Sequence, residues 1–109
     1  MTILIAPIGI DTNHVKVWLK EVGSDAEKLW LIHSPKNSKH DFPKIANDLI
    51  KDVKKLFTEL EINLRVINNA FDVDTTLDTI RDIIYEERDK NDDIHPREFI
   101  LNITGGTNA

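Results

Sequence analysis

The residues best suited to hold a ligand stand near the end of the sequence, in the segment Thr104-Gly105-Gly106-Thr107-Asn108. Glycines carry no Cβ, so their backbone amides approach a ligand closely and adopt conformations closed to other residues. The threonine hydroxyls and the Asn108 carboxamide add hydrogen-bonding groups for a phosphate, a ribose or a base. This chemistry suits a phosphate-containing ligand, although a Gly-Gly pair by itself suits a tight strand-to-helix turn equally well.

The elements that must position this segment alternate along the chain. Short continuous apolar runs at residues 3–6 and 29–32 are typical of parallel strands covered on both faces. A fourth predicted strand, residues 99–103, directly precedes the glycines. Residues 62–67 alternate apolar and polar side chains, which predicts a third strand at an edge of the sheet.

Amphipathic helices are predicted between these strands. The first places apolar side chains at helical spacing from residue 15 to 22, with Asp11 or Thr12 as N-cap and Gly23 as its stop. The second is capped by Asp41, and its apolar stripe is Ile45, Leu49, Val53, Leu56, Phe57 and Leu60.

The third helix is predicted to open at Asp74 or Thr75. Its inward side chains are expected to be Leu77, Ile80, Ile83 and Ile84. The charge run 86–90 is expected to be a solvated helix end. Asp72 and Asp74 could pair around a divalent cation, but helix capping is the favoured interpretation.

Strand and helix alternate from the first element to the last, which is the signature of an α/β domain with right-handed parallel crossovers. Two strand orders stay open, a Rossmann-like 3-2-1-4 and a flavodoxin-like 2-1-3-4. The alternating third strand favours 3-2-1-4, because a central position would bury Arg65. We therefore predict one Rossmann-like three-layer sandwich over residues 1–109, with about four parallel strands and helices on both faces.

Ligands of such sheets bind beyond the carboxyl ends of the strands, at the switch point, which lies between the first and fourth strands in this order. The predicted site therefore combines the first loop (Ile8, Gly9, Ile10 and Asp11) with the segment 104–108. His14 and His33 are expected to face the same cleft. The four histidines lack the spacing of metal ligands. Their side chains are expected to be solvated or to have a capping role. No catalytic residue, metal site or cofactor is predicted.

Composition limits the classes of function. With 40% hydrophobic and 30% charged residues, the chain has the balance of a soluble globular protein, and no apolar run reaches transmembrane length. The absence of cysteine excludes disulfides and cysteine catalysis in this chain and agrees with a cytoplasmic location. A net charge of -5 argues against sequence-independent binding to duplex DNA, while a small anionic ligand stays possible.

The chain resembles the CARF family, the CRISPR-associated Rossmann fold. The resemblance is carried by the strand that leads into Thr104-Gly105-Gly106-Thr107, by the opening stretch from Ala6 to Asp11, and by Asp72-Val73-Asp74 before the third helix. It implies a homodimer that binds a cyclic oligoadenylate in the cleft on its two-fold axis and controls a fused effector in antiviral defence.

By position, the resemblance implies that residues 104–107 hold phosphate and ribose while residues 8–11 line the adjacent wall. The family motif often continues with lysine, and Asn108 replaces that charge here. A complete CARF domain continues into a further helix and strands, so we expect an N-terminal or truncated CARF domain that is incomplete at its carboxyl end.

Two alternatives remain beside the sensor. One is a ring nuclease that cleaves the bound cyclic oligoadenylate without a metal; it ranks lower because the site offers no obvious general base or lysine. The other is a nucleotide-binding or receiver-like α/β domain unrelated to CRISPR systems. A receiver, however, needs an acidic cluster after the first strand, where this chain has Ala6-Pro7.

Overall fold

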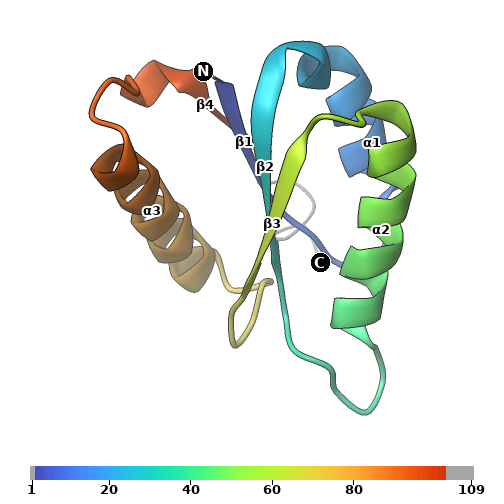
Figure 1. Cartoon of the computed structure of the whole chain (residues 1–109). Helices are drawn as coiled ribbons and strands as arrows, with labels where there is room; N and C mark the ends of the chain where they lie inside the picture. The colour runs from blue at the N-terminus through green and yellow to red at the C-terminus, as the bar shows by residue number, and fades with distance from the viewer. Residues whose placement is uncertain (1, 103–109) are drawn as a thin grey trace.

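A computed structural model describes residues 2–102 and shows one parallel sheet between two helical layers (Figure 1). Its strands are β1 (Thr2–Pro7), β2 (Ala26–His33), β3 (Glu61–Val66) and β4 (Phe99–Leu101). All neighbouring pairs are parallel, and the order is β3-β2-β1-β4. The predicted Rossmann-like order is confirmed and the flavodoxin-like order is wrong.

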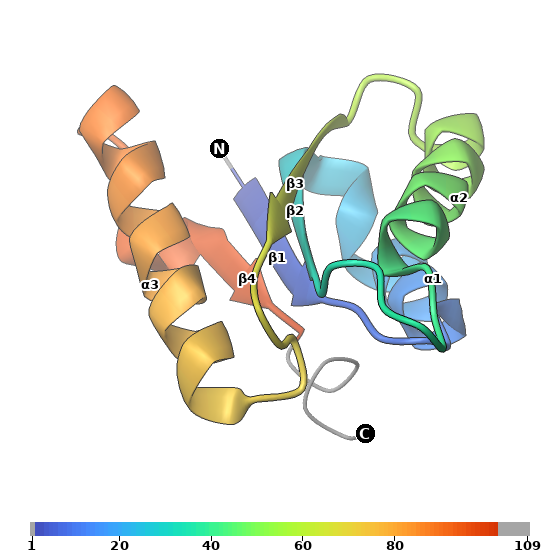
Figure 2. The same cartoon turned by 90° about the horizontal axis from the view of Figure 1, so that it is seen from below.

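Helices cover both faces of this sheet. Within the described residues the α-helices are α1 (Asn13–Val22), α2 (Phe42–Leu56) and α3 (Val73–Lys90), beside two single-turn 3-10 helices, η1 (Gly23–Asp25) and η2 (Pro96–Glu98). Helices α1 and α2 lie together on one face, and α3 lies on the other (Figures 1 and 2). Because all neighbouring strands are parallel, the carboxyl ends of all four strands share one edge of the sheet.

Each face of the sheet carries its own hydrophobic core. Along β1, Leu4 and Ala6 belong to the cluster under α1 and α2, whereas Ile3 and Ile5 belong to the cluster under α3. Alternate side chains of a strand point to opposite faces, so a strand covered on both sides needs a continuous apolar run. This accounts for the apolar runs of β1 and β2.

The first two helices begin where the sequence indicates, and α1 also ends there. The carboxylate of Asp11 accepts a 2.9 Å hydrogen bond from the backbone amide of Asn13, beside the N-cap residue Thr12. Gly23 follows α1, and a Cβ at this position would lie 3.1 Å from the ring of Phe57. Asp41 caps α2 by accepting a hydrogen bond from the amide of Lys44. The helix ends earlier than its predicted stripe, so Leu60 is buried outside it.

The start and the inner face of α3 differ from the prediction. The N-cap is Asp72, not Asp74 or Thr75, and its carboxylate accepts hydrogen bonds from the amide of Asp74 and the hydroxyl of Thr75. Ile80 and Ile83 face the core as expected, and Ile84 packs at its border. Leu77 is 45% exposed and does not face inward.

The reason is the rotation of α3 about its axis. The buried positions on this helix are Thr76, Thr79, Ile80, Ile83 and Glu87. Three of them carry oxygen, so hydrophobicity alone places the inner face about one residue too far along the helix. The hydroxyl of Thr76 donates to the carbonyl of Ala70, which accounts for its burial.

Candidate functional site

The carboxyl edge of the sheet brings the ends of β1 and β4 together. Ile5 pairs with Leu101 across the two strands, and the amide of Asn102 donates a 3.0 Å hydrogen bond to the carbonyl of Ile5. On the other side of β1, the amide of Ile8 donates to the carbonyl of Ile32 at 2.8 Å. The chain therefore leaves β1 and β4 at neighbouring points of the edge, which is the switch point of this sheet.

The first predicted loop divides into buried and exposed residues. Ile8 is fully buried in the core under α1 and α2, and Gly9 is also buried. Ile10 is 56% exposed, and Asp11 is exposed beside it. A ligand at this edge would meet the side chains of Ile10 and Asp11, whereas Ile8 and Gly9 could offer only backbone atoms.

The second predicted half of the site is the segment Thr104, Gly105, Gly106, Thr107 and Asn108. These residues lie outside the described part of the chain, as does Ile103 at the predicted end of the fourth strand. Their role as phosphate-binding groups therefore stays a prediction.

Two histidines stand near this edge in different environments. His33, at the end of β2, is only 5% exposed, and its Nδ1 donates to the carbonyl of Ser34 at 2.8 Å, so the prediction of a solvated side chain is wrong for it. His14, in the first turn of α1, is partly exposed. Its Nε2 is buried and makes no hydrogen bond with any other residue between 2 and 102.

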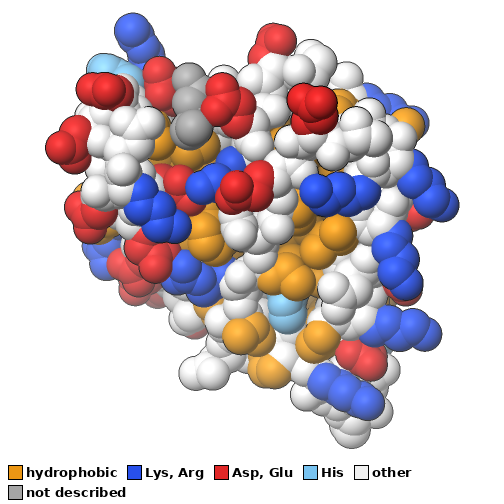
Figure 3. Space-filling view, viewed as in Figure 1, with side chains coloured by type: hydrophobic (Ala, Val, Ile, Leu, Met, Phe, Trp, Pro, Cys, Tyr) orange, Lys and Arg blue, Asp and Glu red, His pale blue; other side chains and the backbone are white. Residues whose placement is uncertain are grey.

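A surface depression that the sequence did not reveal lies at the carboxyl ends of β2 and β3. It has a volume of about 520 Å³ and is lined by Ile10, by part of the connection 34–42 and by part of the connection 68–71. Figure 3 shows hydrophobic side chains gathered on the lower part of this face, with Lys and Arg side chains along one border. Ile10 thus lies between the switch point and the depression.

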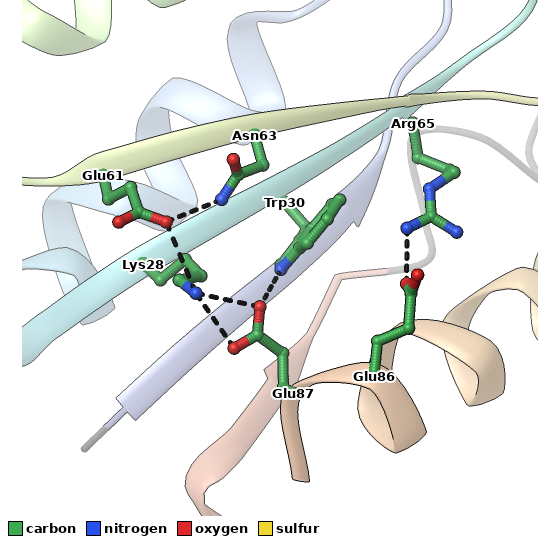
Figure 4. A network of polar contacts seen from close by, with 7 residues as sticks. All are labelled: Lys28, Trp30, Glu61, Asn63, Arg65, Glu86 and Glu87. Atoms are coloured by element: carbon green, nitrogen blue, oxygen red, sulfur yellow. Dashed lines mark hydrogen bonds and ion pairs between the residues drawn. The ribbon is translucent and has the colours of Figure 1, made fainter. Parts of the chain in front are cut away.

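A polar network joins the carboxyl-terminal end of α3 to β2 (Figure 4). Glu87 is 2% exposed; both of its oxygens accept hydrogen bonds from Lys28 Nζ at 2.9 Å, and Oε1 also accepts one from Trp30 Nε1 at 2.9 Å. The prediction that residues 86–90 are simply solvated is therefore wrong for Glu87. Because the carboxylate is fully paired, it is not available for catalysis.

Arg65 shows how an edge strand keeps a charged side chain partly exposed. Its guanidinium pairs with Glu86 of α3 and lies 5.1 Å from the ring centroid of Trp30 (Figure 4). The planar guanidinium can stack on an aromatic face while its nitrogens bind a carboxylate. Arg65 therefore covers the hydrophobic cluster under α3 at Trp30.

Neither a cluster of metal-ligating side chains nor a membrane-spanning helix occurs in the described part of the chain. Among residues 2–102, no group of three or more His, Asp or Glu side chains is arranged to hold a metal ion. None of the helices in this part of the chain combines the length and the apolar character needed to cross a bilayer.

Comparison of the chain with protein-family models, with curated proteins and with solved structures found no match. Among residues 2–102, the strand order brings the ends of β1 and β4 and the loop 8–11 to the same part of the carboxyl edge.

Proposed function

We propose that this chain is a regulatory sensor domain that binds a cyclic oligoadenylate between the connections that follow β1 and β4. The main support for this proposal is the strand order β3-β2-β1-β4, in which β1 and β4 are parallel neighbours. This order supports a site shared by residues 8–11 and 104–108, which is where the CARF-like residues of the sequence occur.

The exposed groups of the first loop suit parts of such a ligand. Ile10 offers an apolar surface to an adenine ring, and the exposed carboxylate of Asp11 can accept a hydrogen bond from a ribose hydroxyl. The amides of Gly105 and Gly106 supply the phosphate contacts in this proposal.

A two-fold dimer extends the proposed site. A cyclic oligoadenylate with an even number of residues presents repeated units, and two copies of one short loop pair around a two-fold axis can bind equivalent units of the ring. The ligand then holds two copies in a defined orientation. A change in that orientation is the signal that an attached effector would read.

Binding rather than cleavage is the favoured activity. The loop between Pro7 and Thr12 has no lysine or arginine to stabilise charge on a phosphate during strand cleavage. Its acidic side chain, Asp11, accepts a hydrogen bond from the backbone of α1. Both features support a site that holds the ring intact.

The proposed site is tested by titrating cyclic tetra-adenylate and cyclic hexa-adenylate into the wild-type protein and into the Gly106→Val variant. Loss of at least tenfold in affinity is expected for this variant, because a β-branched side chain obstructs close approach to the backbone. The control is Thr58→Val, which places a valine side chain in an exposed turn at the opposite edge of the sheet, away from the proposed site. Unchanged affinity in Gly106→Val would show that the glycines form only a turn.

A further inference from the structure

The depression at the carboxyl ends of β2 and β3 is a second place where a ligand can bind. We propose that it is a site for a neutral purine nucleoside, with the base held between its aromatic wall and its asparagine side chains. This inference concerns a different ligand from the function proposed above and, apart from Ile10, which borders both places, different residues. It therefore stands or falls independently of cyclic oligoadenylate binding.

Hydrogen bonds between the two connections fix the walls of the depression. The amide of Ala70 donates to Ser34 Oγ at 2.8 Å, and the amide of Ile67 donates to the carbonyl of His33 at 3.0 Å. Ser34 and Ala70 are both buried. The connections after β2 and β3 are thus tied to each other, and a ligand need not order them on binding.

Aromatic side chains form one wall. The rings of His40 and Phe42 lie 5.6 Å apart between centroids, and those of Phe42 and Phe71 lie 5.8 Å apart in an edge-on arrangement. Phe42 is anchored in the protein at 3% exposure, whereas His40 and Phe71 are only partly buried. Partly exposed rings on an anchored ring offer a surface for stacking, which every nucleobase can use.

Asparagine carboxamides provide the polar part. Asn37 Oδ1 accepts hydrogen bonds from the amides of Lys39 and His40, at 2.8 and 2.9 Å, and Asn69 Oδ1 accepts one from Phe71 at 3.0 Å. These bonds fix the two side chains and leave their Nδ2 groups as donors. The carboxamide of Asn68 makes no hydrogen bond with another residue of the described chain.

A planar carboxamide can both donate to and accept from the edge of a purine, as in the pairing of asparagine with adenine. Three such groups beside an aromatic wall fit a heteroaromatic ring better than a plain hydrocarbon. The volume of about 520 Å³ lies within the range of small-molecule sites.

The charges around the depression favour a neutral ligand over a phosphorylated one. Lys36 is the charged residue that lines it, and its Nζ lies 3.9 Å from the carboxylate of Asp41. The nearby ends of α2 and α3 are already capped by Asp41 and Asp72. A phosphate beside Lys36 would also lie close to the carboxylate of Asp41, so the nucleoside is expected to bind at least as well as its monophosphate.

The test is an NMR titration of the ¹⁵N-labelled full chain with adenosine. Binding is monitored through the backbone amide and side-chain amide signals of the protein. Saturable shifts are expected for Asn37, Asn68, Asn69 and Phe71, and ribose alone should produce none. Asn68→Ala should weaken adenosine binding about fivefold, the usual effect of one lost hydrogen bond. Asn47→Ala is the matched control, since this exposed side chain of α2 bonds only to Pro43 and does not line the depression.

Each contrary result overturns the proposal. It is wrong if adenosine gives no saturable shift at these residues, or if Asn68→Ala binds adenosine as tightly as Asn47→Ala does. It is also wrong if adenosine monophosphate binds more than tenfold tighter than adenosine, because the site would then recognise an anion. Cyclic oligoadenylate is absent from every arm, so none of these results depends on the switch-point site.

Discussion

Trp30 of β2 and Glu87 of α3 are joined by a 2.9 Å hydrogen bond from the indole Nε1 to a carboxylate oxygen that is almost fully buried. Lys28, two residues earlier on β2, donates hydrogen bonds to both oxygens of the same carboxylate (Figure 4). Among the described residues, α3 is the only α-helix on this face of the sheet, so the contact helps to hold the main cover of that face in place. A buried charge whose hydrogen-bond partners are all present fixes the orientation of the helix on the strand. Removing one of the partners lowers the free energy of unfolding substantially.

Glu87→Ala is predicted to lower the free energy of unfolding by about 3 kcal/mol, because it leaves the Trp30 N–H and the Lys28 ammonium without their acceptor. Glu86→Ala, the neighbouring change, removes an exposed pair with Arg65 and should cost less than about 1 kcal/mol. Urea unfolding of both variants measures the difference. Equal losses would contradict a structural role for the buried carboxylate.

The free energy of unfolding should fall as the pH rises above the ordinary pKa of a lysine side chain. Burial lowers the pKa of Lys28, but its hydrogen bonds and charge pairing with Glu87 and Glu61 outweigh burial and raise the pKa above 10.5. A raised pKa in the folded state means that this stabilisation is complete below pH 10.5 and is lost as the pH rises through the folded value.

Lys28→Met isolates this contribution. Over the range from neutral pH to about pH 11.5, the unfolding free energy of the wild type should fall more steeply than that of the variant. The difference between the two curves cancels the titration of the other lysines. Parallel curves above pH 10 would show that the ammonium group adds no stability.

Two side chains of α3 should respond very differently to truncation. Ile83 has no exposed surface and packs in the core under α3, so Ile83→Ala is expected to cost about 3 kcal/mol. Leu77 is 45% exposed, and Leu77→Ala should cost less than about 1 kcal/mol. Chemical denaturation of the two variants tests the orientation of the helix, and a larger loss for Leu77→Ala would contradict it.

Asp72 is predicted to act as a helix cap and not as a cation ligand. Asp72→Ala should lower stability by about 1 kcal/mol, because the amide of Asp74 loses its acceptor at the start of α3. Asp82→Ala, at an exposed position later in the same helix, serves as the control and should be nearly neutral. Wild-type stability that rises on addition of Mg²⁺ and a variant that does not respond would favour a cation site instead.

The sheet was predictable because its local patterns agree with its tertiary environment. Continuous apolar runs mark strands that are covered on both faces, and β1 is one of them. The alternation around Arg65 correctly placed β3 at an edge, which decided the strand order. These signals are periodic and depend little on which side chains meet.

The inner face of α3 and the depression depend on partners that are distant in sequence. A run of five charged residues does not reveal that Glu87 turns inward, because the cause is the indole N–H of Trp30, 57 residues away. The depression likewise forms only when Ser34 and Ala70 join two connections. Asn68 and Asn69 were visible in the sequence, but as ordinary turn residues.

The most direct measurement of the central proposal is calorimetric titration of the wild-type chain with cyclic tetra-adenylate and cyclic hexa-adenylate, with linear tetra-adenylate as control. We expect saturable binding of at least one of the two rings, with one ring bound by two copies of the chain. The linear control should bind weakly, and the ring should be recovered uncleaved. Absence of binding by every ring, or equal affinity for the linear control, would contradict the proposal.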